Sequence, residues 1–226
     1  MYKVLLFDLD ETLMDFLKTE AAAISKSFLA FGLEPTSALI STYSEINRQE
    51  WERLERGETT RDELLVHRFR RLFRRIGVQI DPAEFHAVYQ YRLGQEVFLV
   101  EGVIELLEWL KGRYRLFILS NGVAITQDSR LKQSGLLPYF ENVFLSERIG
   151  HVKPERAYYD ACFSMIPDFH HREALVIGDS LSADILGGNR AGVDTCWFNY
   201  RSHPAREDIL PTYTINKLSQ LKHIVS

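Results

Sequence analysis

Apolar residues gather in five short and nearly continuous runs along the chain. They cover Lys3 to Phe7, Arg115 to Leu119, Asn142 to Leu145, Ala174 to Ile177 and Thr195 to Phe198. Runs without alternating polar positions are typical of strands that are buried on both faces of a parallel sheet. A weaker run, Tyr213 to Ile215, predicts a further strand at the edge of this sheet.

Helical patterns separate the later runs. Between Val103 and Lys111, apolar side chains recur on one helix face, and Gly112 follows as a stop signal. Strands that alternate with helices predict an α/β fold with a doubly wound parallel sheet.

Residues 15–98 have a different pattern, because they contain several amphipathic helical segments and no convincing strand. Gly32 and Gly77, each leading to a following proline, mark the ends of separate helices. We therefore predict two domains. Residues 1–14 and 99–226 would form a discontinuous α/β core, and residues 15–98 a helical domain inserted after the first strand.

Five arginines stand beside an apolar stripe in one of the inserted helices. They are Arg68, Arg70, Arg71, Arg74 and Arg75. An amphipathic helix explains them as a solvated polar face, so we favour this interpretation over a nucleic-acid patch.

Charge and cysteine content narrow the function classes. The 226 residues carry a net charge of -4, so no general basic field would attract a nucleic acid polymer or an anionic membrane. Cys162 and Cys196 stand among apolar neighbours, which is typical of buried thiols in a reducing compartment. The N-terminus has no signal-peptide pattern, and no run approaches the ~20 apolar residues of a membrane span. We expect a soluble, cytoplasmic protein that is a monomer or a homodimer.

Polar residues stand at the carboxyl ends of the predicted strands. They are Asp8-Leu9-Asp10-Glu11-Thr12, Ser120-Asn121-Gly122, Lys153-Pro154 and Gly178-Asp179-Ser180 with Asp184. Taken singly, each fits a helix cap or a solvated charge. Ligands of an open parallel sheet bind at this edge, however, and the strand ends would bring Asp8, Asp10 and Asp179 together.

Three clustered carboxylates repel one another, and burying them without cations is costly. A divalent cation resolves this conflict, and oxygen ligands beside a substrate phosphate suit Mg²⁺. Lys153 and the Ser120 hydroxyl would then bind the remaining phosphoryl oxygens.

These residues resemble the four motifs of the haloacid dehalogenase-like hydrolases, in order and at the expected strand ends. The motifs are the segment from Asp8 to Thr12, Ser120, Lys153, and Gly178-Asp179-Ser180 with Asp184. The resemblance covers essentially the whole chain, and the helical insertion resembles that family's cap domain. Glu11 departs from the commonest pattern, which has glycine there, but both aspartates are present.

The resemblance implies a phosphatase mechanism. Asp8 would attack phosphorus and form an aspartyl-phosphate, while Asp10 would act first as general acid and then as general base. Mg²⁺ would be held by Asp8, Asp179 and the backbone carbonyl of Asp10. Ser120, Asn121 and Lys153 would bind the phosphate. Thr12, Ser180 and Asp184 would support the catalytic and metal-binding residues from one shell further out.

Within the family, the chain resembles nucleoside 5'-monophosphate phosphatases that act on pyrimidine nucleotides. The matching stretches are Phe7 to Leu13 with Asp15-Phe16, Ser120-Asn121-Gly122 with Thr126-Gln127, and Thr195 to Asn199 with Pro211-Thr212-Tyr213. The last stretch lies away from the expected phosphate site, so it indicates kinship more than chemistry. The substrate that this resemblance implies is a pyrimidine nucleoside monophosphate.

A nucleobase needs a flat apolar contact and a polar group that binds its edge, which Phe16, Asn47 and Trp51 could supply. Aromatic residues at helical spacing also fit core packing, so both interpretations stay open. Arg56 and Arg61 could instead reach a substrate anion, or lie exposed at the surface.

Other functions remain open at this stage. A phosphatase of another small metabolite, such as a sugar phosphate or phosphoglycolate, and a phosphomutase would use nearly the same residues. In the pattern typical of haloacid dehalogenases, the second aspartate is absent and no metal is needed. The presence of Asp10 and Asp179 argues against this function. A regulatory module on the same fold would not need the catalytic residues that are present.

Overall fold

The computed structural model describes residues 1–226 as two compact units. The α/β unit comprises Met1–Asp15, Leu99–Ala124 and Ser134–Ser226, and the helical unit comprises Phe16–Phe98 and Ile125–Gln133. The helical unit thus includes part of a helix from the second half of the chain. The predicted boundaries of the folding domains stay a prediction.

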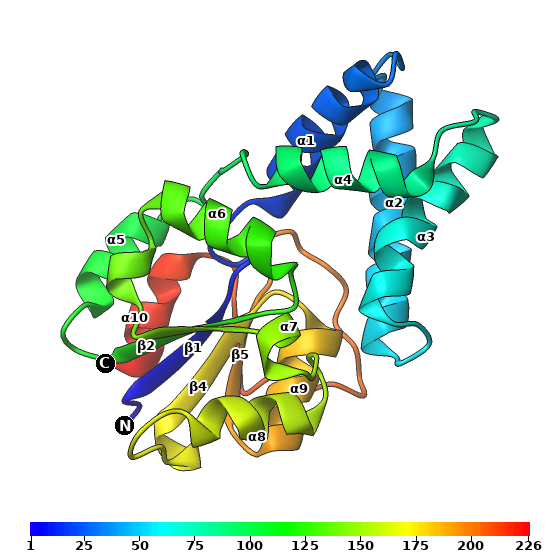
Figure 1. Ribbon diagram of the computed structural model, residues 1–226. Coiled ribbons are helices and arrows are strands. Elements are labelled where there is room, and N and C mark those ends of the chain that lie inside the picture. Colours follow the sequence, from blue (N-terminus) through cyan, green and yellow to red (C-terminus); the bar gives the residue numbers. More distant parts are fainter. The chain divides into compact units, whose positions relative to one another are not determined.

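Six parallel strands form one sheet in the α/β unit, in the order β3-β2-β1-β4-β5-β6 (Figure 1). The strands are β1 (Val4–Asp8), β2 (Arg115–Ser120), β3 (Asn142–Leu145), β4 (Ala174–Gly178), β5 (Asp194–Phe198) and β6 (Tyr213–Ile215). The predicted doubly wound parallel sheet is confirmed, and no strand end differs from its predicted position by more than one residue.

The strand order reverses at β1, which has β2 on one side and β4 on the other. Asp8 pairs with Leu119 of β2, and Phe7 pairs with Ile177 of β4. The carboxyl ends of the three central strands are therefore level. Residues that follow these strands meet at one edge of the sheet, where open α/β folds bind their ligands.

Helices cover both faces of the sheet (Figure 1). In the α/β unit these helices are α5 (Val103–Leu110), α7 (Ser146–Ile149), α8 (Arg156–Ser164), α9 (Leu186–Ala191) and α10 (Leu221–Val225). Most of α6 (Ala124–Ser134) belongs to the helical unit. Short helical turns add η1 (Leu137–Tyr139), η2 (His171–Glu173), η3 (Leu181–Ile185) and η4 (Leu218–Gln220).

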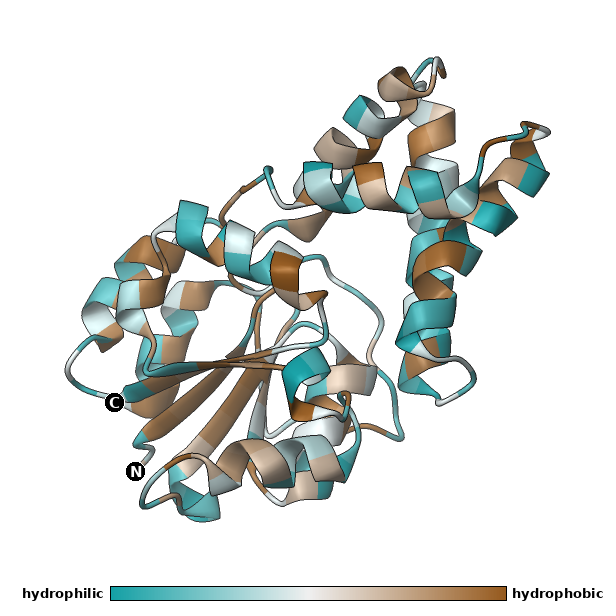
Figure 2. Ribbon diagram, in the orientation of Figure 1, coloured by the Kyte–Doolittle hydropathy of each residue, from teal (hydrophilic) through white to brown (hydrophobic).

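The strands are buried on both faces, as their continuous apolar runs predict. Val4 and Leu6, alternate residues of β1, pack against Tyr159 and Cys162 of α8, whereas α5 and α10 lie on the other face (Figure 1). Figure 2 shows the strands as a hydrophobic layer between helices of mixed polarity. The central strands β1 and β4 are buried along their whole length, so the polar chemistry of this unit gathers beyond their ends.

Four helices form most of the helical unit, namely α1 (Phe16–Ala30), α2 (Ser37–Glu55), α3 (Arg61–Ile76) and α4 (Pro82–Leu93). Helix α1 packs on α4, and α3 packs on both α2 and α4. Aromatic rings fill the core, where Tyr43 stacks on Phe69 with their centroids 5.4 Å apart. Thr60 and Glu63 form a capping box that begins α3, and Gly77 ends this helix with a φ of 72°.

The interpretation of all five arginines of α3 as a solvated face is wrong at Arg68, which is 2% exposed. Its guanidinium lies 4.9 and 5.0 Å from the ring centroids of Phe69 and Tyr89. Its Nη1 atom donates a hydrogen bond to Asn47 Oδ1 at 2.8 Å. Because α3 is covered by two neighbouring helices, its buried face is wider than the apolar stripe alone.

Cys162 and Cys196 are buried free thiols, as their apolar neighbours predict. None of the helices combines the length and the apolar character that crossing a membrane requires.

Candidate active site

Lys153 lies among the carboxylates at the carboxyl end of β1. Its ammonium group donates hydrogen bonds to Asp8 Oδ1 at 2.6 Å, to Asp184 Oδ1 at 2.7 Å and to the carbonyl of Leu119 at 3.1 Å. Asp8, Lys153 and Asp184 are all buried, with 7%, 2% and 1% of their surface exposed. Lys153 thus binds two aspartates that lie 145 and 31 residues away from it in the sequence.

Three carboxylates surround this single ammonium group. Oxygen atoms of Asp8, Asp179 and Asp184 lie within 4.8 Å of one another. Asp8 Oδ2 is buried and has no hydrogen-bond partner in the protein. A buried carboxylate oxygen without a partner is costly, so this atom needs a cation or a donor that the chain itself does not supply. The set of oxygen donors therefore fits a hard divalent cation such as Mg²⁺.

The electrostatics of the site reflect this excess of negative charge. Burial, opposed by Lys153 and reinforced by Asp184 and Asp10, raises the pKa of Asp8 to about 7. Burial and the nearby charge of Asp8 also raise the pKa of Asp179 well above its usual value. Burial by itself would lower the pKa of Lys153, but Asp184 and Asp8 raise it well above the usual range, so the ammonium group stays charged.

The turn after β1 carries Asp10, whose charge contributes to the raised pKa of Asp8. The backbone amides of Leu13 and Met14 both donate to the carbonyl of Leu9 at 2.9 Å, which closes the turn. Asp10 then forms an isolated parallel bridge with Met14. The chain has left the strand at this point, so the alternation of strand side chains no longer separates the two aspartates.

The loop after β4 is shaped around Asp184. The Ser180 amide donates to Asp184 Oδ2 at 3.1 Å, and the Ser180 hydroxyl accepts from the Ala183 amide at 3.1 Å. A β-carbon on Gly178 would lie 2.2 Å from Asp184 Oδ2, so only glycine allows this close approach. Ser180 and Asp184 thus order the loop that carries Asp179.

Asn121 holds the backbone of Lys153. Its side-chain Nδ2 donates to the Lys153 carbonyl, and its Oδ1 accepts from the Lys153 amide, both at 2.9 Å. The sequence predicts Asn121 only as a phosphate-binding residue and does not reveal this paired contact, which joins positions 32 residues apart. Ser120 Oγ accepts a hydrogen bond from the Gly122 amide at 3.1 Å. The phosphate-binding roles of Ser120, Asn121 and Lys153 stay predictions.

Thr12 is fully buried, and its hydroxyl has no hydrogen-bond partner. Its predicted supporting role stays a prediction.

Trp197 of β5 contacts the loop that carries Asp179, because its indole Nε1 donates to the Asp179 carbonyl at 2.7 Å. The sequence indicates kinship for this tryptophan and no link with the site. This contact joins β5 to the loop after β4, so it becomes visible only in the folded structure.

The candidate specificity residues lie in the helical unit. Asn47 is 3% exposed, and its Nδ2 donates to Glu20 Oε1 at 2.6 Å while its Oδ1 accepts from Arg68. Phe16 begins α1, with the guanidinium of Arg130 5.8 Å from its ring centroid. Trp51 is a half-buried residue of α2. The substrate-binding roles of Phe16, Asn47 and Trp51 stay predictions.

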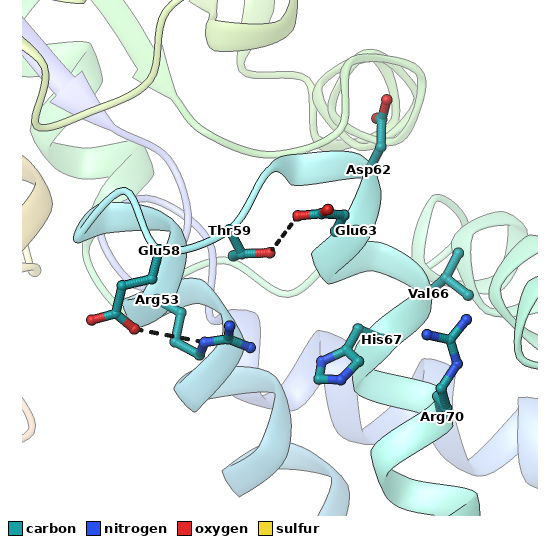
Figure 3. A pocket seen from close by; sticks show the side chains of 8 residues that line it. All are labelled: Arg53, Glu58, Thr59, Asp62, Glu63, Val66, His67 and Arg70. Carbon is teal, nitrogen blue, oxygen red and sulfur yellow. Dashed lines mark hydrogen bonds and ion pairs between the residues drawn. The ribbon is translucent and has the colours of Figure 1, made fainter.

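The two arginines that could reach a substrate anion, Arg56 and Arg61, flank the turn between α2 and α3. Arg56 pairs with Glu58, and Arg61 is the first residue of α3. A hollow of about 710 Å³ opens between the end of α2 and α3 (Figure 3). Its lining mixes both signs of charge: Arg53, Glu58, Thr59, Asp62, Glu63, Val66, His67 and Arg70. It therefore has no clear preference for an anion or a cation.

The fold and the four motif positions together define a haloacid dehalogenase-like hydrolase, and the chain belongs to this family, which it matches over residues 2–192. The family resemblance in the sequence is thus confirmed, and the chain is an enzyme of the hydrolase class.

Two bacterial nucleotidases and one hydrolase are similar along nearly their full lengths. HAD-hydrolase YfnB of Bacillus subtilis (strain 168) is 40% identical, with 100% of this chain and 96% of that protein covered. A crystal structure of YfnB bound to magnesium has a TM-score of 0.96 and covers 100% and 99% of the two chains. Pyrimidine 5'-nucleotidase PynA of Streptococcus pneumoniae is 38% identical over 97% of this chain and 93% of PynA. Pyrimidine 5'-nucleotidase YjjG of Escherichia coli is 28% identical over 97% and 96%.

Proposed function

We propose that this hydrolase is a Mg²⁺-dependent phosphatase that acts on pyrimidine nucleoside 5'-monophosphates through an aspartyl-phosphate on Asp8. The observation that carries the proposal is the buried Asp8 Oδ2 atom, which has no partner although Lys153 fixes the other oxygen of the same carboxylate. An oriented carboxylate with one uncommitted oxygen is the arrangement that a nucleophile or a metal ligand needs.

Asp8 and Asp10 carry the proton and bond changes of the reaction. A carboxylate oxygen of Asp8 attacks phosphorus, the bond from phosphorus to the substrate oxygen breaks, and Asp10 gives its proton to the departing alkoxide. Asp10, now ionised, accepts a proton from water while the water oxygen attacks the phosphorus of the aspartyl-phosphate. Phosphate then leaves, and the Asp8 carboxylate is restored.

The other motif residues bind and orient the phosphoryl group. Lys153 and the Ser120 hydroxyl bind phosphoryl oxygens, and the paired contact with Asn121 keeps the lysine backbone in place. Asp8, Asp179 and the Asp10 backbone carbonyl are the groups that would hold Mg²⁺. When bound, this ion offsets the negative charge of the three carboxylates and of the phosphoryl oxygens.

The relatives support a nucleotide as the substrate, because two of them are pyrimidine 5'-nucleotidases that align over almost the whole chain. The aromatic residues Phe16 and Trp51 are the candidates for contact with the base. A phosphatase of another small metabolite and a phosphomutase remain alternatives, because the core residues act on the phosphoryl group that all these substrates share. A dehalogenase is disfavoured by Asp10 and Asp179.

We also propose a reducing, cytoplasmic location, which the buried free thiols of Cys162 and Cys196 support. The partner is a small phosphomonoester, and whether the enzyme is a monomer or a homodimer stays a prediction.

A substrate panel tests the proposal. Protein freed of metal with a chelator would be assayed for phosphate release with and without Mg²⁺. The substrates would be uridine, thymidine, adenosine and guanosine 5'-monophosphates, glucose 6-phosphate, 2-phosphoglycolate and p-nitrophenyl phosphate. The Asp8→Asn protein, purified in the same way, controls for contaminating phosphatases. We expect Mg²⁺-dependent release with the highest kcat/KM for the pyrimidine nucleotides.

Other results of the panel would contradict the proposal at different levels. A clear preference for a sugar or carboxylate phosphate would refute the substrate class while keeping the chemistry. Transfer of phosphate to a sugar phosphate without release would indicate a mutase. Full activity in the chelator would refute the metal requirement.

A further inference from the structure

Glu11, directly after Asp10, has a backbone conformation that glutamate seldom adopts. Its φ is 63°, in the left-handed region. A residue with a β-carbon loses about 1–2 kcal/mol in this region relative to its usual conformations. The conformation belongs to the turn that follows β1, in which the Glu11 amide donates to the Met14 carbonyl at 2.7 Å. Other contacts must therefore hold Glu11 in place.

The side chain of Glu11 makes such contacts. The Tyr200 hydroxyl donates to Glu11 Oε2 at 2.9 Å, and Arg201 Nε donates to the same oxygen. Arg201 Nη2 also donates to Asp15 Oδ1 at 3.0 Å, at the far end of the turn. The Glu11 side chain is only 14% exposed, so these bonds are partly shielded from water. Together, Tyr200 and Arg201 grip the turn at both ends.

The two donors are themselves fixed by the sheet. They follow β5 (Asp194–Phe198) after Asn199, whose amide donates to the Ile215 carbonyl of β6 at 2.7 Å. Asn199 closes the loop by a further pair of hydrogen bonds with the backbone of His203, at 2.9 and 2.8 Å. The Arg201 guanidinium stacks on the Tyr200 ring, with 4.7 Å between its carbon and the ring centroid. The loop after β5 is thus anchored by hydrogen bonds to the sheet and within itself.

We propose that Glu11 is a positioning residue, whose carboxylate, gripped by Tyr200 and Arg201, sets the turn so that Asp10 meets the leaving-group oxygen. This inference rests on the proposed role of Asp10 as general acid. It assigns a function to the loop after β5, which carries none of the four family motifs.

The leaving group gives a readout that separates positioning from general stability. A nucleoside 5'-alkoxide is a poor leaving group and needs a proton from Asp10, whereas p-nitrophenolate is a stable anion and departs without one. A displaced Asp10 therefore slows the nucleotide selectively. A loosened or partly unfolded site slows both substrates equally.

The experiment compares kcat/KM for uridine 5'-monophosphate and p-nitrophenyl phosphate in the Mg²⁺-loaded enzyme. The variants are Glu11→Ala and Tyr200→Phe, and Glu11→Gln as a conservative change that keeps an acceptor for Tyr200. Tyr2→Phe is the matched control, because Tyr2 also donates to a carboxylate, Asp194 Oδ2 at 2.6 Å, but at the amino end of β5. Thermal unfolding of each variant checks that it is folded.

We expect Glu11→Ala and Tyr200→Phe to lower kcat/KM for the nucleotide by roughly tenfold and that for p-nitrophenyl phosphate by less than about twofold. Glu11→Gln should lose less nucleotide activity than Glu11→Ala. The double variant Glu11→Ala with Tyr200→Phe should lose no more than Glu11→Ala alone, because both changes remove the same contact between the two side chains. Tyr2→Phe should match the wild type for both substrates.

Equal losses for the two substrates, or wild-type activity of Glu11→Gly, would overturn the inference. The glycine variant matters because it adopts a positive φ freely and lacks the carboxylate. Asp10→Asn distinguishes this failure from that of the proposed function. If Asp10→Asn does not discriminate between the substrates, the general-acid role fails; if it does and the Glu11 variants do not, only the positioning role fails.

Discussion

The two units of the molecule treat buried charge in opposite ways. At the carboxyl edge of the sheet, Asp8, Asp179 and Asp184 form a cluster in which Lys153 pairs with Asp8 and Asp184, and one oxygen of Asp8 has no partner. In the helical unit, the ratio of acidic to basic groups is reversed. One carboxylate, that of Glu50, is buried and is surrounded by three basic side chains.

Glu50 has no exposed side-chain surface. Its oxygens lie 2.9 Å from Arg53 Nη1, 2.5 Å from Arg71 Nη1 and 3.2 Å from His67 Nδ1. Although burial by itself would raise it, the pKa of Glu50 is lowered by Arg71 and His67. A lowered pKa means that the folded state stabilises the ionised form, so this cluster contributes to stability.

A second network of the helical unit links two buried charges of opposite sign through an amide, although Arg68 Nη2 has no hydrogen-bond partner. Asn47 joins the buried carboxylate of Glu20 to the buried guanidinium of Arg68 through one hydrogen bond to each. Raised pKa values of Asp8 and Asp179 indicate the contrary at the sheet edge, where folding disfavours the ionised carboxylates. The comparison teaches that unmatched charge marks the candidate site, whereas matched charge holds a fold together.

The largest expected effect is that of Asp8→Asn on turnover. Loss of the nucleophile should lower kcat on the order of 10⁴-fold or more. Stability should move in the opposite direction, because one member of a repelling cluster loses its charge. Burial raises the pKa of Asp8 to about 7, so in metal-free wild type its ionisation destabilises the fold progressively as pH rises from the ordinary aspartate range to about 7.

Activity assays with Mg²⁺ and thermal unfolding in chelator, both at pH 8, check this prediction. An Asp8→Asn protein that retained turnover would refute the nucleophile, and one that unfolded at a much lower temperature would show that the charge cluster stabilises the fold.

Addition of Mg²⁺ should sharpen the comparison by supplying the missing positive charge. At about one hundred times its dissociation constant, a ligand that binds only the folded state adds about 2.7 kcal/mol to the free energy of unfolding. We expect the unfolding temperature of the wild type to rise with Mg²⁺ concentration and that of Asp179→Asn to stay nearly constant. An identical rise in both proteins would place the ion elsewhere.

Glu50→Gln should break the paired cluster of the helical unit. It leaves three basic groups around a neutral amide, and we expect a loss of about 2 kcal/mol, less than for a fully buried ion pair because the basic side chains are partly exposed to solvent. Because the folded pKa of Glu50 is lowered, its contribution is present above the ordinary glutamate range and is lost as pH falls below it. The difference between variant and wild type should therefore shrink in acid.

Chemical denaturation at pH 7 and at pH 4 measures this effect. Glu45→Gln is the matched control, since Glu45 lies on the same helix and pairs with Arg48 in an exposed ion pair. We expect that change to cost less than about 0.5 kcal/mol. Equal losses in the two variants would mean that the buried cluster has no special weight.

Asn47→Ala has the smallest expected effect and tests whether this residue supports the fold or contacts the base. It removes one hydrogen-bond partner each from Glu20 and Arg68, which should cost about 1–2 kcal/mol. The ratio of kcat/KM for uridine 5'-monophosphate to that for p-nitrophenyl phosphate should stay unchanged. A selective loss of nucleotide hydrolysis without loss of stability would favour the substrate role instead.

Local sequence predicts the sheet well, because burial on both faces leaves a continuous apolar run wherever a strand lies. The same rule places polar residues at strand ends, so the motif residues Asp8, Ser120, Lys153 and Asp179 could be picked out without coordinates. The end of a helix at a glycine could also be predicted, as Gly77 ends α3 in the left-handed conformation. These features depend only on neighbours along the chain.

Contacts between distant segments could not be obtained in this way. Whether a buried charge is matched depends on which side chains the fold brings beside it, as for Lys153 between Asp8 and Asp184, or Arg68 between two helices. The grip of Tyr200 and Arg201 on Glu11 spans about 190 residues and has no local pattern. The sequence by itself determined the strands and the chemistry available at their ends. Only the tertiary structure decided how that chemistry is paired, because electrostatic pairing acts through space and not along the chain.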